Sequence, residues 1–192
     1  MNSLRMQNDL KVAVDVLKGG GVILYPTDTI WGIGCDATNP EAVSKVYKLK
    51  QREDSKSMLV LIENPGWLNL YLDKVPDFAW DLIELTEKPL TIIYPGAKNL
   101  AKNLIADDGS IGIRVVKNEF CEQLIRRFGK PIVSTSANIS GSSSPKGYHY
   151  IDERIITEVD FVIPSTYCSM LNTKPSSIIQ LGLKGEVRVI RE

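Results

Sequence analysis

Apolar residues occur along the chain in short blocks that alternate between helical and strand-like spacing. The first block has helical spacing, stops at three consecutive glycines and is followed by an uninterrupted apolar run. The helical positions are Leu10, Ala13, Val14 and Leu17, the glycines are residues 19–21, and the apolar run is 22–25. This order predicts a helix followed at once by a buried strand.

The next two elements are predicted with defined ends. Asn39, Pro40 and Glu41 combine a capping residue, a proline at the first helical position and an acid in the first turn. We therefore expect a helix that runs from here to about Lys50. Residues 58–62 are uniformly apolar rather than alternating, which predicts a strand covered on both faces.

The same alternation of helices and strands continues to the end of the chain. Helices are expected over residues 76–87 and, after an Asn118 cap, up to Phe128, where Gly129 and Pro131 follow. A polar loop is expected at 95–110, and strands at 90–94, 111–116, 132–133, 161–163, 177–181 and 187–190. Interleaved helices and strands favour an α/β fold, and 192 residues favour one domain over residues 1–192.

Composition excludes several classes of protein. Lys plus Arg number 23 and Asp plus Glu number 23, so a net charge of +0 gives no general attraction to phosphate polymers. No apolar run approaches the roughly 20 residues that span a membrane, and residues 1–11 lack the apolar core of a secretory signal. We expect a cytoplasmic protein without membrane contact. Its three widely spaced cysteines, Cys35, Cys121 and Cys168, are expected to be buried, reduced thiols.

Two polar segments in the first third of the chain could carry chemistry. Residues 26–34 follow a buried strand, and their hydroxyls and glycines would let a ligand approach the backbone. The alternative is a turn in which Asp28 and its neighbouring threonines satisfy local backbone groups. Residues 45–56 hold five cations, of which Lys50 and Arg52 could bind phosphate or carboxylate. The alternative there is a solvated helix end, where cations are favoured by the helix dipole.

A third polar segment, 134–141, follows the short strand 132–133. It carries five hydroxyl or amide side chains, which suit either a polar cradle or a capped turn. The Ser- and Gly-rich residues 140–147 are interpreted as a mobile active-site loop. The single histidine, His149, has no partner histidine, and no phosphate-binding glycine motif is present. An enzyme built from these groups would position anionic substrates and stabilise charge without a covalent intermediate.

Taken together and in this order, the segments resemble the YrdC-type threonylcarbamoyl-AMP synthases over nearly the whole chain. Residues 20–37, Lys50-Gln51-Arg52 and Ser134-Thr135-Ser136-Ala137-Asn138 look like the Pro-Thr-x-Thr, Lys-x-Arg and Ser-x-Asn motifs of that family. The resemblance implies a twisted mixed sheet flanked by helices, with a large concave active-site surface. It also implies a nucleotidyltransferase that converts ATP, L-threonine and bicarbonate into threonylcarbamoyl-AMP and pyrophosphate. The product would feed N6-threonylcarbamoyladenosine synthesis, with the tRNA threonylcarbamoyl transferase machinery as partners.

The resemblance assigns roles to individual residues. Thr29 and Arg114 would hold the threonine. The expected catalytic residues, which would hold the bicarbonate or carbamate and the phosphates, are Lys50, Arg52, Ser136 and Asn138. The expected nucleotide contacts are Lys50, Arg52, Ser134, Asn138, Ser140, Ser176 and Arg191. Mg²⁺ would arrive with ATP, without a dedicated metal site on the protein.

The chain departs from the family pattern at a few points. Asp28 stands where Glu is common and Trp31 where Tyr or Phe is common, and both could alter the shape of the threonine pocket. From the resemblance we expect the short form of the family, without the additional C-terminal domain of longer relatives. A loop that closes over the site is therefore expected within this domain, and residues 142–148 are the candidate.

Two other functions stay open on sequence grounds. One is a module that binds tRNA or double-stranded RNA without synthase activity, whose affinity would fall steeply with salt. The other is a carbamoyl-adenylate-forming enzyme like the related domain of hydrogenase-maturation proteins, which uses carbamoyl phosphate. The choice between threonine and carbamoyl phosphate as substrate separates this second alternative from the synthase.

Overall fold

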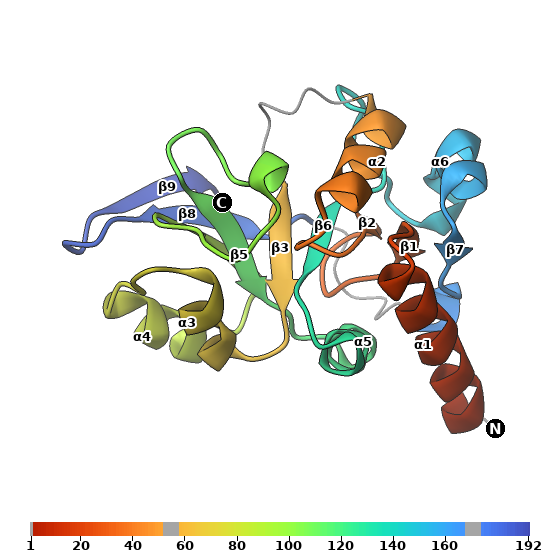
Figure 1. Cartoon of the computed structure of the whole chain (residues 1–192), viewed down its shortest axis with the longest axis horizontal. Helices are drawn as coiled ribbons and strands as arrows, with labels where there is room; N and C mark the ends of the chain where they lie inside the picture. The colour runs from red at the N-terminus through yellow and green to blue at the C-terminus, as the bar shows by residue number, and fades with distance from the viewer. Residues whose placement is uncertain (1, 52–57, 168–173) are drawn as a thin grey trace.

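The computed structural model describes residues 2–51, 58–167 and 174–192 (Figure 1). The strands in these ranges are β1 (Ile23–Tyr25), β2 (Gly32–Gly34), β3 (Leu59–Ile62), β4 (Leu90–Tyr94), β5 (Ile111–Val115), β6 (Ile132–Ser136), β7 (Phe161–Val162), β8 (Ser177–Leu181) and β9 (Val187–Arg191). The α-helices are α1 (Asn2–Lys18), α2 (Pro40–Lys50), α3 (Leu68–Tyr71), α4 (Phe78–Leu85), α5 (Glu119–Phe128) and α6 (Glu153–Glu158).

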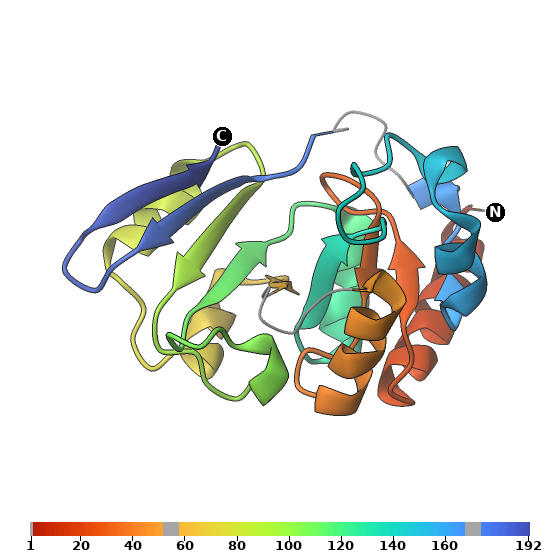
Figure 2. The ribbon, with the colours of Figure 1, turned by 90° about the horizontal axis from the view of Figure 1, so that it is seen from above.

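Within the described ranges the strands form one nine-stranded sheet in the order β7-β1-β2-β6-β3-β5-β4-β8-β9. The pairs β1–β7, β3–β5 and β4–β8 are parallel, whereas the remaining pairs are antiparallel. This confirms the expected α/β fold with a mixed sheet. The β8–β9 hairpin lies at the end of the sheet opposite α1 and β7, as Figures 1 and 2 show.

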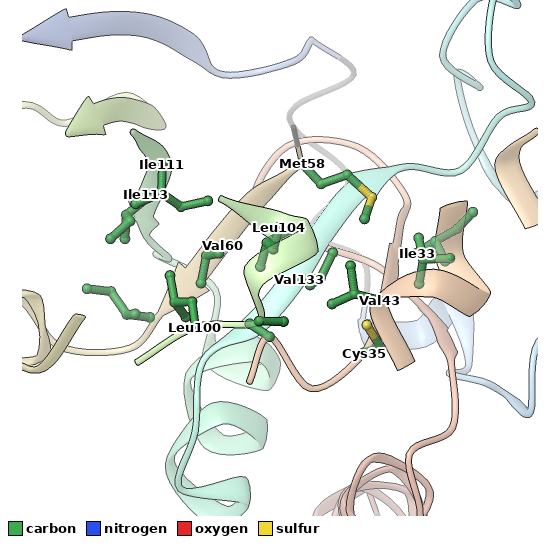
Figure 3. Packing of buried hydrophobic residues seen from close by; sticks show 14 of the residues in the cluster. Ile33, Cys35, Val43, Met58, Val60, Leu100, Leu104, Ile111, Ile113 and Val133 are labelled. Atoms are coloured by element: carbon green, nitrogen blue, oxygen red, sulfur yellow. The ribbon is translucent and has the colours of Figure 1, made fainter. Parts of the chain in front are cut away.

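Helices cover both faces of the central strands. On one face α1 packs against α5, and their apolar side chains share a core with Leu61 of β3 and Ile132 of β6. On the other face Val43 of α2 packs with Val60 and Val133, together with side chains from the segment after β4 (Figure 3). Consecutive residues of β3 therefore belong to two separate cores, which confirms the prediction that this strand is covered on both faces.

The predicted helix ends are confirmed by their caps. The Asn39 side-chain oxygen accepts hydrogen bonds from the backbone N–H groups of Glu41 and Ala42, and α2 ends at Lys50. The Asn118 side chain accepts from the Cys121 N–H at the start of α5. That helix ends at Phe128 and is capped by Gly129, whose φ of 77° lies in the left-handed region that glycine adopts at little cost.

Some elements differ from the sequence prediction. Residues 32–34, expected to be part of a ligand-approach turn, form β2, and β6 extends to Ser136 rather than ending at residue 133. A Cβ on Gly34 would lie 2.5 Å from the Val133 carbonyl oxygen, so the glycine is what lets β2 run this close to β6. Residues 95–110 are not a wholly polar loop, because they include a 3₁₀ turn (Lys102–Leu104) and bury Leu100 and Leu104 (Figure 3).

Several short helical elements were not predicted at all. A 3₁₀ turn (Pro65–Trp67) leads into α3, and α6 follows another 3₁₀ turn (Tyr148–Tyr150). Cys35 and Cys121 are buried and free, as expected, whereas Cys168 lies outside the described residues. In the described part of the chain, no helix has the length and apolar character needed to cross a membrane.

Candidate active site

An open cavity of about 310 Å³ lies on the sheet. Its lining residues lie on or next to neighbouring strands in the sheet order β2-β6-β3-β5-β4-β8-β9. Leu59 and Ser134 each lie two residues along their strands from a side chain of the α1–α5 core, Leu61 and Ile132 respectively. Gly112 lies four residues before Val116, which also belongs to that core. Because side chains alternate between the two faces of a strand, all three cavity residues lie on the same face of the sheet as this core. The cavity therefore occupies the part of this face that the two helices leave uncovered. Its volume is within the usual range for small-molecule sites.

Arg114 of β5 is the most deeply buried cation among the residues that line the cavity. Its side chain is 3% exposed, and Nη2 lies 2.9 Å from Oδ1 of Asp28. The same Nη2 donates to the Thr29 hydroxyl at 3.3 Å. Among the residues that the structure describes, Nε of Arg114 is buried and has no hydrogen-bond partner. A guanidinium has five N–H donors, and those at Nη1 make no hydrogen bond to another described residue, so they remain for a ligand.

The Thr29 hydroxyl faces the cavity as an acceptor. Thr27 donates its hydroxyl hydrogen to the Ile30 carbonyl at 2.8 Å and accepts from the Thr29 N–H at 3.0 Å. The two threonine oxygens lie 2.9 Å apart, so Thr29 must be the donor of the bond between them. Because a hydroxyl has one hydrogen and two lone pairs, Thr29 can only accept further bonds: one lone pair accepts from Arg114 and the other remains for a ligand.

A second guanidinium reaches the cavity from the last strand. Arg191 donates through Nε and Nη2 to the Ser176 carbonyl at 3.0 and 2.8 Å. The buried Ser176 hydroxyl lies 2.8 Å from the Thr91 hydroxyl of β4, which ties the two strands' ends together. Loss of water around the Arg191 guanidinium and then the positive charge of Arg114 lower the pKa of Arg191. The cavity thus has two mutually repelling cations, which favours an anionic ligand between them.

Lys50 is buried at the end of α2, and it does not line the cavity. Its side chain is 1% exposed, and Nζ donates to the backbone carbonyls of Ser136 and Asn138, the latter at 2.6 Å. The Ser140 N–H in turn donates to the Lys50 carbonyl at 2.9 Å. In this structure Lys50 therefore holds the segment after β6 in place, whereas the family resemblance placed it against the phosphates.

The segment after β6 folds over one side of the cavity. Asn138 donates through Nδ2 to the carbonyls of Ile139 and Ser142 and does not itself line the cavity. Ser144, further along, is one of the lining residues. The Tyr148 ring lies 5.2 Å from the ring of Trp31, also a lining residue, with a tilt of 53°. The segment therefore contacts the site at two places, directly through Ser144 and through the packing of Tyr148 against Trp31.

Two buried groups lie beneath the site without taking part in it. The Tyr25 hydroxyl donates to the Val133 carbonyl at 3.2 Å, and the Cys121 thiol donates to the Pro26 carbonyl at 3.2 Å. Burial above all raises the pKa of both groups, so both stay protonated at neutral pH. Their role is to support the strand ends from which the cavity residues project.

The structure brings together many of the residues expected from the sequence. The expected residues that line the cavity are Thr29, Arg114, Ser134, Ser136, Ser176 and Arg191. Lys50, Asn138 and Ser140 lie next to this group without lining it, and Arg52 lies outside the described residues. Sequence reasoning did not single out Thr91 or Ser110, whereas Ser144 belongs to the expected active-site loop. Thr91 gave a signal, because it is the one residue of its strand that is neither aliphatic nor aromatic.

Among the described residues, no group of three or more His, Cys, Asp or Glu side chains could hold a metal ion. The cavity side chains that carry charge are instead the two arginines. The donors are therefore suited to a ligand with carboxylate or phosphate groups.

Comparison with known proteins identifies relatives along almost the entire chain. The Sua5_yciO_yrdC family model, described as "Telomere recombination", matches residues 15–192. A threonylcarbamoyl-AMP synthase from Pseudoalteromonas translucida is 33% identical over 175 residues, which cover 90% of this chain and 92% of the relative.

Two solved structures share the fold. Escherichia coli YciO has a TM-score of 0.82 at 27% identity, with 97% of this chain and 89% of YciO covered. Pyrococcus abyssi Sua5 in complex with L-threonine has a TM-score of 0.80 at 23% identity, with 90% of this chain covered. The chain spans about half the length of that Sua5 protein, since 50% of it is covered.

Proposed function

The chain belongs to the Sua5/YciO/YrdC family, and from this membership we propose that it is a threonylcarbamoyl-AMP synthase. The reaction joins L-threonine, bicarbonate and ATP and releases pyrophosphate and water. The observation that carries the proposal is the pairing of Arg114 with Thr29 in a cavity that Arg191 also reaches. One cation with a neighbouring acceptor suits an amino acid, and the second cation suits a phosphate group.

Arg114 and Thr29 match the two polar ends of an amino acid. The unused Nη1 donors of Arg114 can bind a carboxylate, a group that guanidinium binds strongly. Thr29, with its own hydrogen committed to Thr27, can accept a hydrogen bond from an amine or a hydroxyl. A threonine between them is therefore held by complementary groups at both ends.

The chemistry needs positioning and charge stabilisation more than a protein nucleophile. The threonine amine attacks bicarbonate with loss of water, or carbon dioxide with loss of a proton. An oxygen of the resulting carbamate then attacks the α-phosphorus of ATP as pyrophosphate leaves. Both nucleophiles come from the substrates, so the protein has to bring anions together and offset their repulsion. Arg191 and the hydroxyls of Ser134 and Ser136 are placed on the cavity wall for this. Mg²⁺, carried on the ATP phosphates as part of the substrate, would neutralise charge on the leaving group.

We further propose that Lys50 and Arg52 complete the anion-binding side of the site. Lys50 organises the end of β6, where Ser136 lines the cavity. The product would be passed to the machinery that transfers threonylcarbamoyl groups to tRNA. We place this reaction in the cytoplasm, which the two buried, unbridged cysteines support, because free thiols persist in reducing compartments.

The test is pyrophosphate release from ATP and Mg²⁺ by the purified protein, with L-threonine and bicarbonate each added or omitted. The proposal expects release that requires both. Release with carbamoyl phosphate instead of threonine would identify the carbamoyl-adenylate-forming alternative. Salt-sensitive RNA binding without any release would identify an RNA-binding module.

A further inference from the structure

We propose that Asp28 is a positioning residue for Arg114: its carboxylate holds the guanidinium so that the remaining donors face the carboxylate of the substrate. This inference rests on the proposed function, because it names L-threonine as the ligand that Arg114 binds. It assigns a task to the position at which the chain departs from the Glu common in its family.

The geometry separates Asp28 from the ligand and joins it to Arg114. Asp28 is 5% exposed and is not among the residues that line the cavity, whereas Arg114 is. Oδ1 of Asp28 lies 2.9 Å from Nη2 of Arg114, and Oδ2 accepts from the Lys117 N–H at 3.3 Å. The carboxylate is therefore itself anchored to the backbone just beyond β5. A fixed carboxylate 2.9 Å from Nη2 limits rotation of the guanidinium about its last side-chain bonds by charge attraction.

The burial of Arg114 makes such an anchor necessary. A guanidinium that is 3% exposed has lost most of its water, and a compensating charge is needed for it to remain in place. Thr29 supplies a neutral acceptor on the same Nη2, so the only formal charge shown to balance Arg114 in the described residues is Asp28. Without that charge, a long flexible side chain would turn toward water or toward the cavity mouth.

The variant that tests this is Asp28→Asn, which keeps the size and one oxygen of the side chain but removes its charge. We expect the KM for L-threonine in pyrophosphate release to rise about tenfold or more, which corresponds to the loss of one well-placed contact. The KM for ATP is expected to stay within about twofold, because Asp28 does not reach the nucleotide contacts. Asp28→Glu, which retains the carboxylate, should restore a KM for threonine within about threefold of the original.

Asp36→Asn is the matched control. Asp36 is also buried, and it pairs with Lys130 at 2.8 Å, but neither residue lines the cavity. Its replacement removes a buried carboxylate of the same type and is expected to leave the KM for threonine unchanged. Equal effects of Asp28→Asn and Asp36→Asn on that KM, or equal rises in the KM values for threonine and ATP in Asp28→Asn, would overturn the proposal.

A spectroscopic measurement tests, independently of activity, whether Asp28 holds the Arg114 guanidinium in place. In protein labelled with ¹⁵N-arginine, the Arg114 Nε–H signal, assigned by its loss in Arg114→Lys, should exchange slowly with water. We expect that protection to be lost in Asp28→Asn and kept in Asp28→Glu and Asp36→Asn. Protection that persists in Asp28→Asn would overturn the proposal.

The Arg114 Nε–H signal also distinguishes a failure of the proposed function from a failure of the positioning role of Asp28. If the unaltered protein releases no pyrophosphate, the proposed function fails, while loss of Nε–H protection in Asp28→Asn still supports the positioning role. If Asp28→Asn does not fold, Asp28→Glu decides, because it should keep both the Nε–H protection and the KM for threonine. A raised KM with unchanged protection in Asp28→Glu would overturn the proposal.

Discussion

Lys50 shows how a buried cation can shape a site without lining it. Its ammonium donates to two carbonyls at the end of β6, and these acceptors would lose their partner if the charge were removed. We therefore expect Lys50→Met to lower the free energy of unfolding by about 1–3 kcal/mol, the usual cost of unsatisfied buried groups. Pyrophosphate release should fall with it, because Ser136 on the cavity wall loses its support.

Urea unfolding and the pyrophosphate assay measure these two effects. Lys48→Met is the control, because Lys48 is exposed on the same helix and its loss should change the free energy of unfolding by less than about 0.5 kcal/mol. Equal unfolding midpoints for the two variants would contradict a structural role for Lys50.

Gly112 is a residue at which added volume should affect binding more than folding. A Cβ there would lie 3.4 Å from Cγ2 of Thr91 and 3.5 Å from Cβ of Leu59, which are ordinary contacts, and it would project into the cavity. We expect Gly112→Ala to unfold within about 1 kcal/mol of the unaltered protein. The KM for at least one substrate should rise several-fold, as substrate titrations of the pyrophosphate assay would detect.

Gly34→Ala provides the contrast on a neighbouring part of the sheet. A Cβ on Gly34 would lie 2.5 Å from the Val133 carbonyl and 2.7 Å from the Tyr25 ring, so the strands would have to move apart. We expect overpacking to cost about 1–3 kcal/mol or more in urea unfolding. A Gly112→Ala protein that loses as much stability as Gly34→Ala would show that the cavity floor is not open.

At the scale of elements, prediction succeeded where the local sequence carries its own signals. The start of α2 is set by a capping asparagine and a proline, and the end of α5 by a glycine, so both were predictable from residues next to each other. β2 was not predicted, because glycines disfavour strands locally and only the close approach of Val133 explains Gly34. The 3₁₀ turn at 102–104, of which Leu104 is buried, was missed because isolated leucines in a polar segment have no periodicity.

The turn Ser165–Tyr167 offers an element-scale prediction about alkaline stability. The Tyr167 hydroxyl donates to Asp9 of α1 at 2.7 Å, and its ring stacks on Phe120 at 4.8 Å. Burial and then the bond to Asp9 raise the pKa of Tyr167 to about 12. An unfolded chain releases this proton near its ordinary pKa of about 10, so the contribution to stability is present below pH 10 and lost as pH rises toward 12.

Tyr167→Phe keeps the ring and removes the titrating group. We expect it to be slightly less stable than the unaltered protein at pH 8, because one hydrogen bond is lost. Its free energy of unfolding should then fall less steeply between about pH 10 and pH 12. Urea unfolding of both proteins across this range measures the difference in slope, and parallel curves would contradict the assignment of the raised pKa to Tyr167.

At the scale of the whole molecule, the site is a product of strand order. The sequence indicated hydroxyls at Thr29 and Ser134 as separate polar segments, and the family resemblance added Arg114 and Ser176. What joins them is the order β2-β6-β3-β5-β4-β8, which sets strands from distant parts of the chain side by side. That order depends on long-range pairing, so residues such as Ser110 could not be assigned to the site from local sequence.

The segment 142–148 is where the whole molecule should respond to substrates. Ser144 lines the cavity and Tyr148 packs against Trp31, so a bound ligand would touch or approach both attachments of this segment. We expect ATP and L-threonine together to slow tryptic cleavage after the exposed Lys146 by about tenfold, because closure over a ligand reduces local opening.

Cleavage after Lys74 provides an internal reference in the same digest. Lys74 is exposed between α3 and α4 and does not line the cavity, so its cleavage rate should not depend on the ligands. Equal slowing at both sites would indicate that the ligands stabilise the protein globally, because proteolysis would then follow the overall unfolding equilibrium. Unchanged cleavage at Lys146 would mean that the site stays open when substrates bind. The arginines and hydroxyls on the sheet would then have to retain the reactive intermediate without a closing loop.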